Sequence, residues 1–171
     1  MEARLGPTQA PRGNATPEAT HERLKRMAGI ADELAAALEG HEPEAVSIRP
    51  APDAWSATEI LCHLRDIEDF YMGRMRLMLV NDHPTLVVLD PDRWARERQY
   101  QRNDAREALA TFRAGRRETL VFLRGLTEEQ WERSANHPLL GMITVRRIVH
   151  SMAKHDQVHL AQLARALAGQ A

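Results

Sequence analysis

The feature that most constrains the fold is a set of four long segments whose apolar residues recur at alternating steps of three and four positions. This spacing places the apolar side chains on one face of an α-helix. The segments are expected at residues 16–40, 56–81, 103–126 and 144–168. A helix with one apolar face buries that face against another element, so four of them predict an all-α fold, a four-helix bundle.

Capping residues mark several helix ends. Ser56 and Glu59 are spaced as a capping box, in which each side chain bonds the backbone N–H of the other residue. The stretch Thr127–Gln130 repeats this pattern and predicts a short extra helix. Little favours strands, although the run at residues 85–89 has the composition of an extended segment within a connection bounded by Pro and Asp.

The connection between the second and third helices, residues 81–102, is longer than an antiparallel pair of helices needs. A connection of this length can return along the whole bundle. We therefore predict an up-down-down-up topology with a long crossover, in which the second and third helices run parallel.

Residues 1–15 are rich in Gly, Pro, Thr and Asn and are expected to form a disordered tail, which leaves residues 16–171 as a single domain.

Composition excludes several classes of protein. Lys and Arg number 23 against 24 Asp and Glu, so the formal charge of -1 disfavours nucleic acid as a partner. The arginines at 113, 116, 117 and 124 are interpreted as a solvated helix face. No apolar run reaches the roughly 18 residues of a membrane span. The single cysteine, Cys62, precludes an intramolecular disulfide, fits a reducing cytoplasm and is expected to be a core residue.

Two histidines interrupt the apolar face of the last helix. His155 and His159 continue the same spacing as Val145, Ile148 and Met152, so they stand one turn apart where a bundle favours leucine. An unpaired buried polar group costs roughly 1–3 kcal/mol, and each imidazole therefore needs a partner. A metal ion is one such partner, and a hydrogen bond to backbone or carboxylate is the alternative.

A third ligand is expected from another helix at the same height. His63 lies roughly 10 Å from the start of its helix, and His159 lies about 13 Å from the end of the last helix, at 1.5 Å per residue. If these two helices run antiparallel, His63 and His159 lie at about the same height along the bundle. The histidines at 21, 41, 83, 137 and 150 are interpreted as structural or solvated.

Two stretches resemble the DinB/YfiT-like superfamily of metalloenzymes, and the resemblance extends over roughly residues 17–168. The first is Trp55-Ser-Ala-Thr-Glu-Ile-Leu-Cys-His63-Leu. The second is His137-Pro-Leu-Leu-Gly141 followed by His155-Asp-Gln-Val-His159-Leu-Ala-Gln162. The resemblance implies a four-helix bundle with a metal site of His63, His155 and His159. It also implies a divalent metal, nickel or zinc, in some members a low-molecular-weight thiol, and frequent homodimers.

Three protein ligands leave coordination positions open, as a catalytic site requires. The first hypothesis is a metal-dependent enzyme acting on a small molecule, either a thiol-dependent S-transferase or a hydrolase. The second is a metal- or ligand-binding stress-response module without turnover, and the third is a scaffold whose histidines merely pack. Glu59 is a candidate to support His63 from outside the ligand shell, but its capping role is the favoured interpretation.

Overall fold

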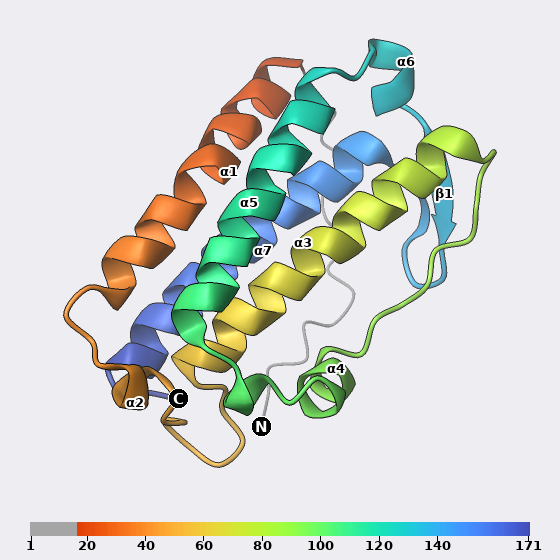
Figure 1. Cartoon of the computed structure of the whole chain (residues 1–171). Coiled ribbons are helices and arrows are strands. Elements are labelled where there is room, and N and C mark those ends of the chain that lie inside the picture. Colours follow the sequence, from red (N-terminus) through yellow and green to blue (C-terminus); the bar gives the residue numbers. More distant parts are fainter. Residues whose placement is uncertain (1–16) are drawn as a thin grey trace.

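The computed structural model describes residues 17–171, and four long helices form its body (Figure 1). They are α1 (Pro17–Leu38), α3 (Ala57–Val80), α5 (Ala105–Arg124) and α7 (Val145–Leu167). In Figure 1, α1 and α7 run down the page while α3 and α5 run up it. The predicted four-helix bundle is confirmed. The tail predicted at residues 1–15 lies outside the described residues.

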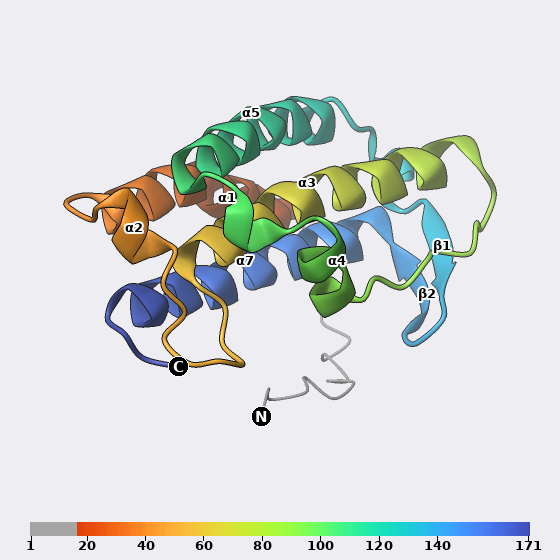
Figure 2. The same ribbon diagram turned by 60° about the horizontal axis from the view of Figure 1, so that its bottom comes forward.

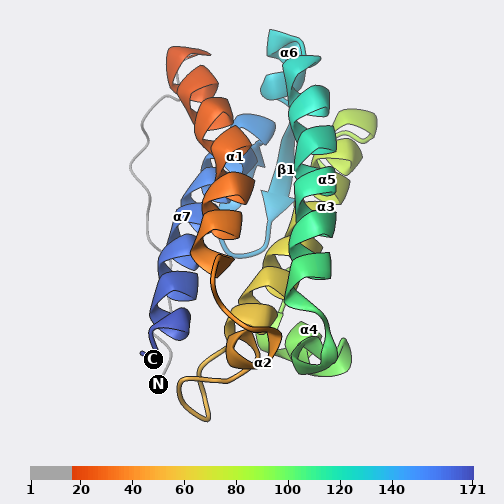
Figure 3. The same cartoon turned by 60° about the vertical axis from the view of Figure 1, so that its left-hand side comes forward.

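Neighbouring helices form a closed ring around the core. Figure 3 shows α1 packed between α7 and α5, with α3 behind them. Apolar side chains fill the two ends of the bundle in separate clusters, one around Leu34, Leu61 and Phe112 and the other around Met27 and Met75. No helix within residues 17–171 has the length and hydropathy needed to span a membrane.

The predicted capping residues are in place at the helix ends. Ser56 accepts a hydrogen bond from the Glu59 backbone N–H, and the Ser56 N–H donates to Glu59 Oε2 at 3.0 Å. Thr127 and Gln130 form the same box at α6 (Glu128–Trp131), the predicted short extra helix. Asp104 caps α5 by accepting from the Glu107 N–H at 2.8 Å. Local hydrogen bonding therefore explains where these helices begin.

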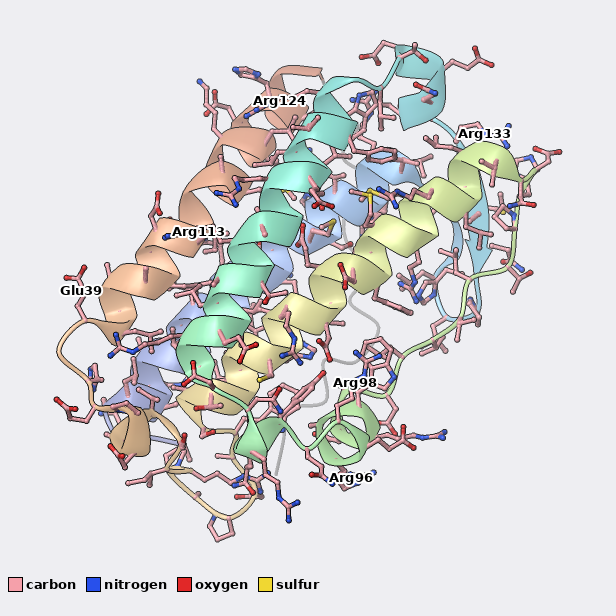
Figure 4. The ribbon with its side chains drawn as sticks, viewed as in Figure 1. Glu39, Arg96, Arg98, Arg113, Arg124 and Arg133 are labelled. Atoms are coloured by element: carbon pink, nitrogen blue, oxygen red, sulfur yellow. The ribbon has the colours of Figure 1, made fainter. Side chains whose placement is uncertain are left out.

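The crossover between α3 and α5 contains two short elements, α4 (Pro91–Glu97) and the 3-10 helix η1 (Tyr100–Arg102). Asp66 of α3 ties the crossover to the bundle, because it accepts hydrogen bonds from Arg98 and from the Tyr100 hydroxyl, each at 2.7 Å. Figure 4 labels Arg98 where the crossover meets α3. These charge-assisted bonds hold the crossover against the helix that carries His63.

A β-hairpin of β1 (Ser134–His137) and β2 (Gly141–Thr144) precedes α7 and was not predicted. Its strands are short and lack clear apolar alternation, and the turn depends on Gly141, whose φ is +71°. The edge of β1 pairs with the crossover, since the Leu86 N–H donates to the Asn136 carbonyl at 2.9 Å. Figure 2 shows the hairpin and α4 on the side of the bundle formed by α3 and α7.

The interpretation of four arginines as a solvated face is wrong for Arg116. This side chain is 2% exposed and donates to Glu68, to Asp156 and to the Met27 carbonyl. The burial of a guanidinium is possible because two carboxylates satisfy its planar fork of donors. The network joins α1, α3, α5 and α7 at mid-height. Arg124, labelled in Figure 4, is exposed as predicted.

The connection between α1 and α3 contains α2 (Pro43–Val46), a single helical turn. Arg49, just after this turn, donates to both carboxylate oxygens of Glu59. The pair fixes the loop that leads into α3, and Trp55 stands at the end of that loop. The loop therefore positions an aromatic ring beside the first turns of α3.

Candidate metal centre

The three predicted histidines come together between α3 and α7. His63 Nε2 lies 3.1 Å from His155 Nε2, and His159 Nε2 lies 3.1 Å from the same atom. All three residues offer a nitrogen within 4.8 Å of the other two. The juxtaposition follows from the helix repeat, since His155 and His159 are four residues apart on α7 and the packed α3 brings His63 to the same height.

The spacing of the nitrogens fits a first-row metal ion. Metal–imidazole bonds of about 2.0–2.1 Å at a tetrahedral angle place two ligand nitrogens roughly 3.3 Å apart. The observed separation of 3.1 Å is close to this value. The Nε2 atoms of His63 and His159 both approach Nε2 of His155, which is the arrangement a chelating site requires.

Burial keeps the three imidazoles neutral. Desolvation, together with the smaller effect of the neighbouring His159, lowers the pKa of His63 to about 3. Desolvation and the other two rings hold the pKa of His155 well below its usual range. Burial likewise lowers the pKa of His159, while its bond to Gln162 acts in the opposite direction. Neutral imidazole is the form that binds metal, so the site is ready for a cation near pH 7.

Hydrogen bonding sets the orientation of one ring. His159 Nδ1 lies 2.7 Å from Gln162 Oε1, and because an amide oxygen only accepts, the proton is on Nδ1. Nε2 of His159 then carries the lone pair toward the other rings. The Nδ1 atoms of His63 and His155 are buried and have no hydrogen-bond partner. The alternative in which all three histidines bond backbone or carboxylate groups therefore lacks support.

Gln162 belongs to the predicted apolar face of α7 but was not predicted as a site residue. The signal was available, because Gln162 follows His159 by three residues and such pairs face each other on a helix.

Aromatic rings enclose the cluster on two sides. The Trp55 ring lies 5.0 Å from the His63 ring and stacks on the His159 ring at 6.5 Å with an interplanar angle of 16°. The Tyr71 ring meets the His155 ring edge-on at 6.2 Å. Neither role was predicted from the sequence, since aromatic residues at these positions are equally suited to the core.

A pocket of about 570 Å³ adjoins the cluster on the Trp55 side. Its walls include Trp55, Glu59 and Tyr100 together with the α4–η1 segment. None of the three histidines lines the pocket, whereas Trp55 lines it and also contacts the His63 ring. Trp55 therefore links the pocket to the histidine cluster.

The buried carboxylates near the cluster already have partners. Glu59 serves the capping box and Arg49, so its predicted capping role is confirmed. Asp156, next to His155 in the chain, is bound to Arg116 at 2.6 Å. Within residues 17–171, no hydrogen bond or ion pair joins a carboxylate to the three histidines. A general base would have to come from water or from the substrate.

Cys62 is buried and its Sγ–H donates to the Tyr100 carbonyl at 3.9 Å. Burial raises the pKa of this thiol to about 11, which keeps it protonated. A thiolate is needed for nucleophilic attack, so Cys62 acts as a core residue, as predicted.

Comparisons with known proteins agree with this geometry. The family model described as "DinB superfamily" matches residues 26–163. The chain is 29% identical over 164 residues to "Putative metal-dependent hydrolase OB0413" of Oceanobacillus iheyensis, covering 95% of this chain and 93% of the relative. It is 27% identical over 139 residues to "Uncharacterized protein YuaE" of Bacillus subtilis, covering 74% and 85%.

The fold is also seen in a solved structure. YfiT from Bacillus subtilis, described as "a probable metal-dependent hydrolase with an unusual four-helix bundle topology", matches with a TM-score of 0.85 over 95% of this chain and 94% of that chain. The two sequences are 20% identical, so the likeness concerns the fold alone.

Proposed function

Because this chain belongs to the DinB superfamily, we propose that it is a metal-dependent hydrolase of a small molecule, with the metal bound by His63, His155 and His159. The observation that carries the proposal is that Nε2 of His155 lies 3.1 Å from Nε2 of both His63 and His159, with all three rings neutral. The name of the relative OB0413, "Putative metal-dependent hydrolase", supports the same class of reaction.

A divalent ion in such a site supplies Lewis-acid polarisation of an electrophile and lowers the pKa of water. Three protein ligands leave room for water and substrate. The chain's own contributions are orientation and exclusion of bulk water. Gln162 holds the His159 ring through Nδ1, and the Trp55 and Tyr71 rings shield the cluster. A set of three imidazoles suits zinc or nickel, and we propose one of these two metals.

The test is metal analysis of protein purified without an affinity tag. We expect about one zinc or nickel ion per chain in the wild type, as three-histidine sites bind one ion, and none in His155→Ala. The matched control is His83→Ala, because His83 is exposed and lies outside the cluster. Metal-free wild type that gains no stability when zinc or nickel is added would refute the proposal.

Thiol-dependent S-transfer is the second candidate, and it uses the same metal site. Since Cys62 is buried and protonated, the thiol would come from a low-molecular-weight cofactor rather than from this side chain. The two reactions are separated by assaying metal-loaded protein with activated esters and, in parallel, with small thiols and an electrophilic acceptor. Ester hydrolysis without added thiol supports the hydrolase, whereas thiol conjugation abolished by a chelator supports the transferase.

Two further predictions depend on the same preparation. A metal-loaded protein inactive in both assays would favour the non-catalytic stress-response module. The predicted homodimer is tested by sedimentation equilibrium, in which we expect twice the mass of the 19.4 kDa chain.

A further inference from the structure

Arg74, on α3, is a half-buried cation without a carboxylate partner. Its Nε atom is buried and makes no hydrogen bond, although Nη2 donates to the Val87 carbonyl. The guanidinium also lies over the Phe70 ring, 4.2 Å from the centroid. Within residues 17–171, no Asp or Glu forms an ion pair with Arg74. A buried charge and an unused donor both carry a free-energy cost, and an anion would relieve both.

Tyr71 lies one turn before Arg74 on the same helix, so the two side chains are neighbours. The ring of Tyr71 meets the ring of His155 at 6.2 Å. The phenol oxygen forms no hydrogen bond with any residue in the described part of the chain. Tyr71 therefore offers an unused donor on a ring that contacts His155 and lies one turn from Arg74.

His137 of β1 faces the same region from the hairpin. Its Nδ1 accepts the Leu139 N–H at 3.2 Å, which places the ring proton on Nε2. The Leu86 N–H donates to the carbonyl of Asn136, the residue before His137, and Arg74 donates to the carbonyl of Val87, so His137 and Arg74 meet the same stretch of the crossover. The positive charge of Arg74 adds to burial in lowering the pKa of His137. A neutral His137 thus presents Nε2–H as a further donor.

We propose that Tyr71, Arg74 and His137 form an anion subsite beside the metal centre, which binds a carboxylate or phosphate group of the substrate. The inference deepens the proposed function, because it names the substrate as a small anion whose reactive end reaches the three histidines. The three donors come from α3 and β1, and the Val87 carbonyl of the crossover holds the guanidinium in place. Arginine suits this role because its planar guanidinium can donate two parallel hydrogen bonds to the oxygens of a carboxylate or of a phosphate.

The test uses full-length, metal-free protein, in which an anion cannot bind through the metal. Inorganic phosphate and acetate are titrated separately by calorimetry and by following the Tyr71 and His137 resonances in NMR spectra. We expect dissociation constants of about 1–10 mM for at least one anion. Arg74→Gln should weaken binding by about 10- to 100-fold, the range for a lost hydrogen bond between charged groups. The anion that binds more tightly identifies the substrate group.

Arg76→Gln is the matched control, because Arg76 is exposed on the same helix and should leave binding unchanged. Tyr71→Phe should weaken binding while keeping the aromatic contact with His155. If neither anion binds below about 10 mM, or if Arg74→Gln binds as tightly as wild type, the subsite is refuted. Metal content is measured on the protein as purified, before the metal is removed, and it tests the proposed function separately, since the anion experiment contains no metal.

Discussion

Metal-free protein should lose stability as the pH falls from 7 to 5, because His63 is buried as a neutral ring. Its pKa is about 3 in the folded protein and about 6.5 in an unfolded chain. Between these values the unfolded state binds a proton that the folded state excludes. The contribution of His63 to stability is therefore complete above pH 6.5 and is lost progressively as the pH falls toward 3.

The expected size of this effect follows from the two pKa values. For His63 alone, proton linkage lowers the free energy of unfolding by about 2 kcal/mol at pH 5 relative to pH 7. The side chain is 4% exposed, so solvent screening does not reduce this figure much. His155 and His159 shift in the same direction and add to the loss. Burial raises the pKa of Asp156, which acts in the opposite direction.

The assay is urea unfolding of metal-free protein at both pH values, for wild type and for His63→Gln. We expect the drop in unfolding free energy to be smaller in the variant by about 2 kcal/mol. Taking the difference between two proteins removes contributions they share, including that of Asp156. His83→Gln, which changes an exposed ring, should behave as wild type. Equal drops in wild type and His63→Gln would refute the idea that burial holds His63 neutral.

Three further predictions concern the metal and the buried polar groups. Zinc at 100 times its dissociation constant should raise the free energy of unfolding by about 2.7 kcal/mol, measured by urea titration, and a chelator should reverse the gain. Gln162→Leu should weaken zinc binding by about tenfold in a competition assay by freeing the His159 ring, with little change in metal-free stability. Arg116→Met should lower the free energy of unfolding by about 3–5 kcal/mol, since its two carboxylate partners remain buried and unpaired. The exposed Arg117→Met should change it by less than about 0.5 kcal/mol, and similar losses in both variants would contradict the argument.

The helices and their ends were predictable because their causes are local. Ser56 and Glu59 satisfy each other's backbone groups within one turn, and the same holds for Thr127 and Gln130. The hairpin was missed because β1 is stabilised by residues distant in sequence. Asn136 bonds Leu86 and Pro84 of the crossover, and no short-range pattern encodes that pairing.

The burial of charged residues likewise depends on residues that are distant in the sequence. The spacing of arginines along α5 resembled a solvated face, and for Arg117 and Arg124 that interpretation agrees with their exposure. Arg116 differs only because α3 and α7 present Glu68 and Asp156 opposite it. Whether a charge is buried depends on partners from other helices, which a single helix cannot specify.

The sequence alone determined the bundle and selected His63, His155 and His159, because helical periodicity and helix length are local properties that place residues on a face and at a height. Only the tertiary structure decided that Nε2 of His155 lies 3.1 Å from Nε2 of both His63 and His159, and that the Tyr71 ring meets the ring of His155. The physical reason is that the residues that make these contacts are far apart in the sequence. Packing between helices and a hairpin sets which polar groups meet, and that packing is a property of the whole fold.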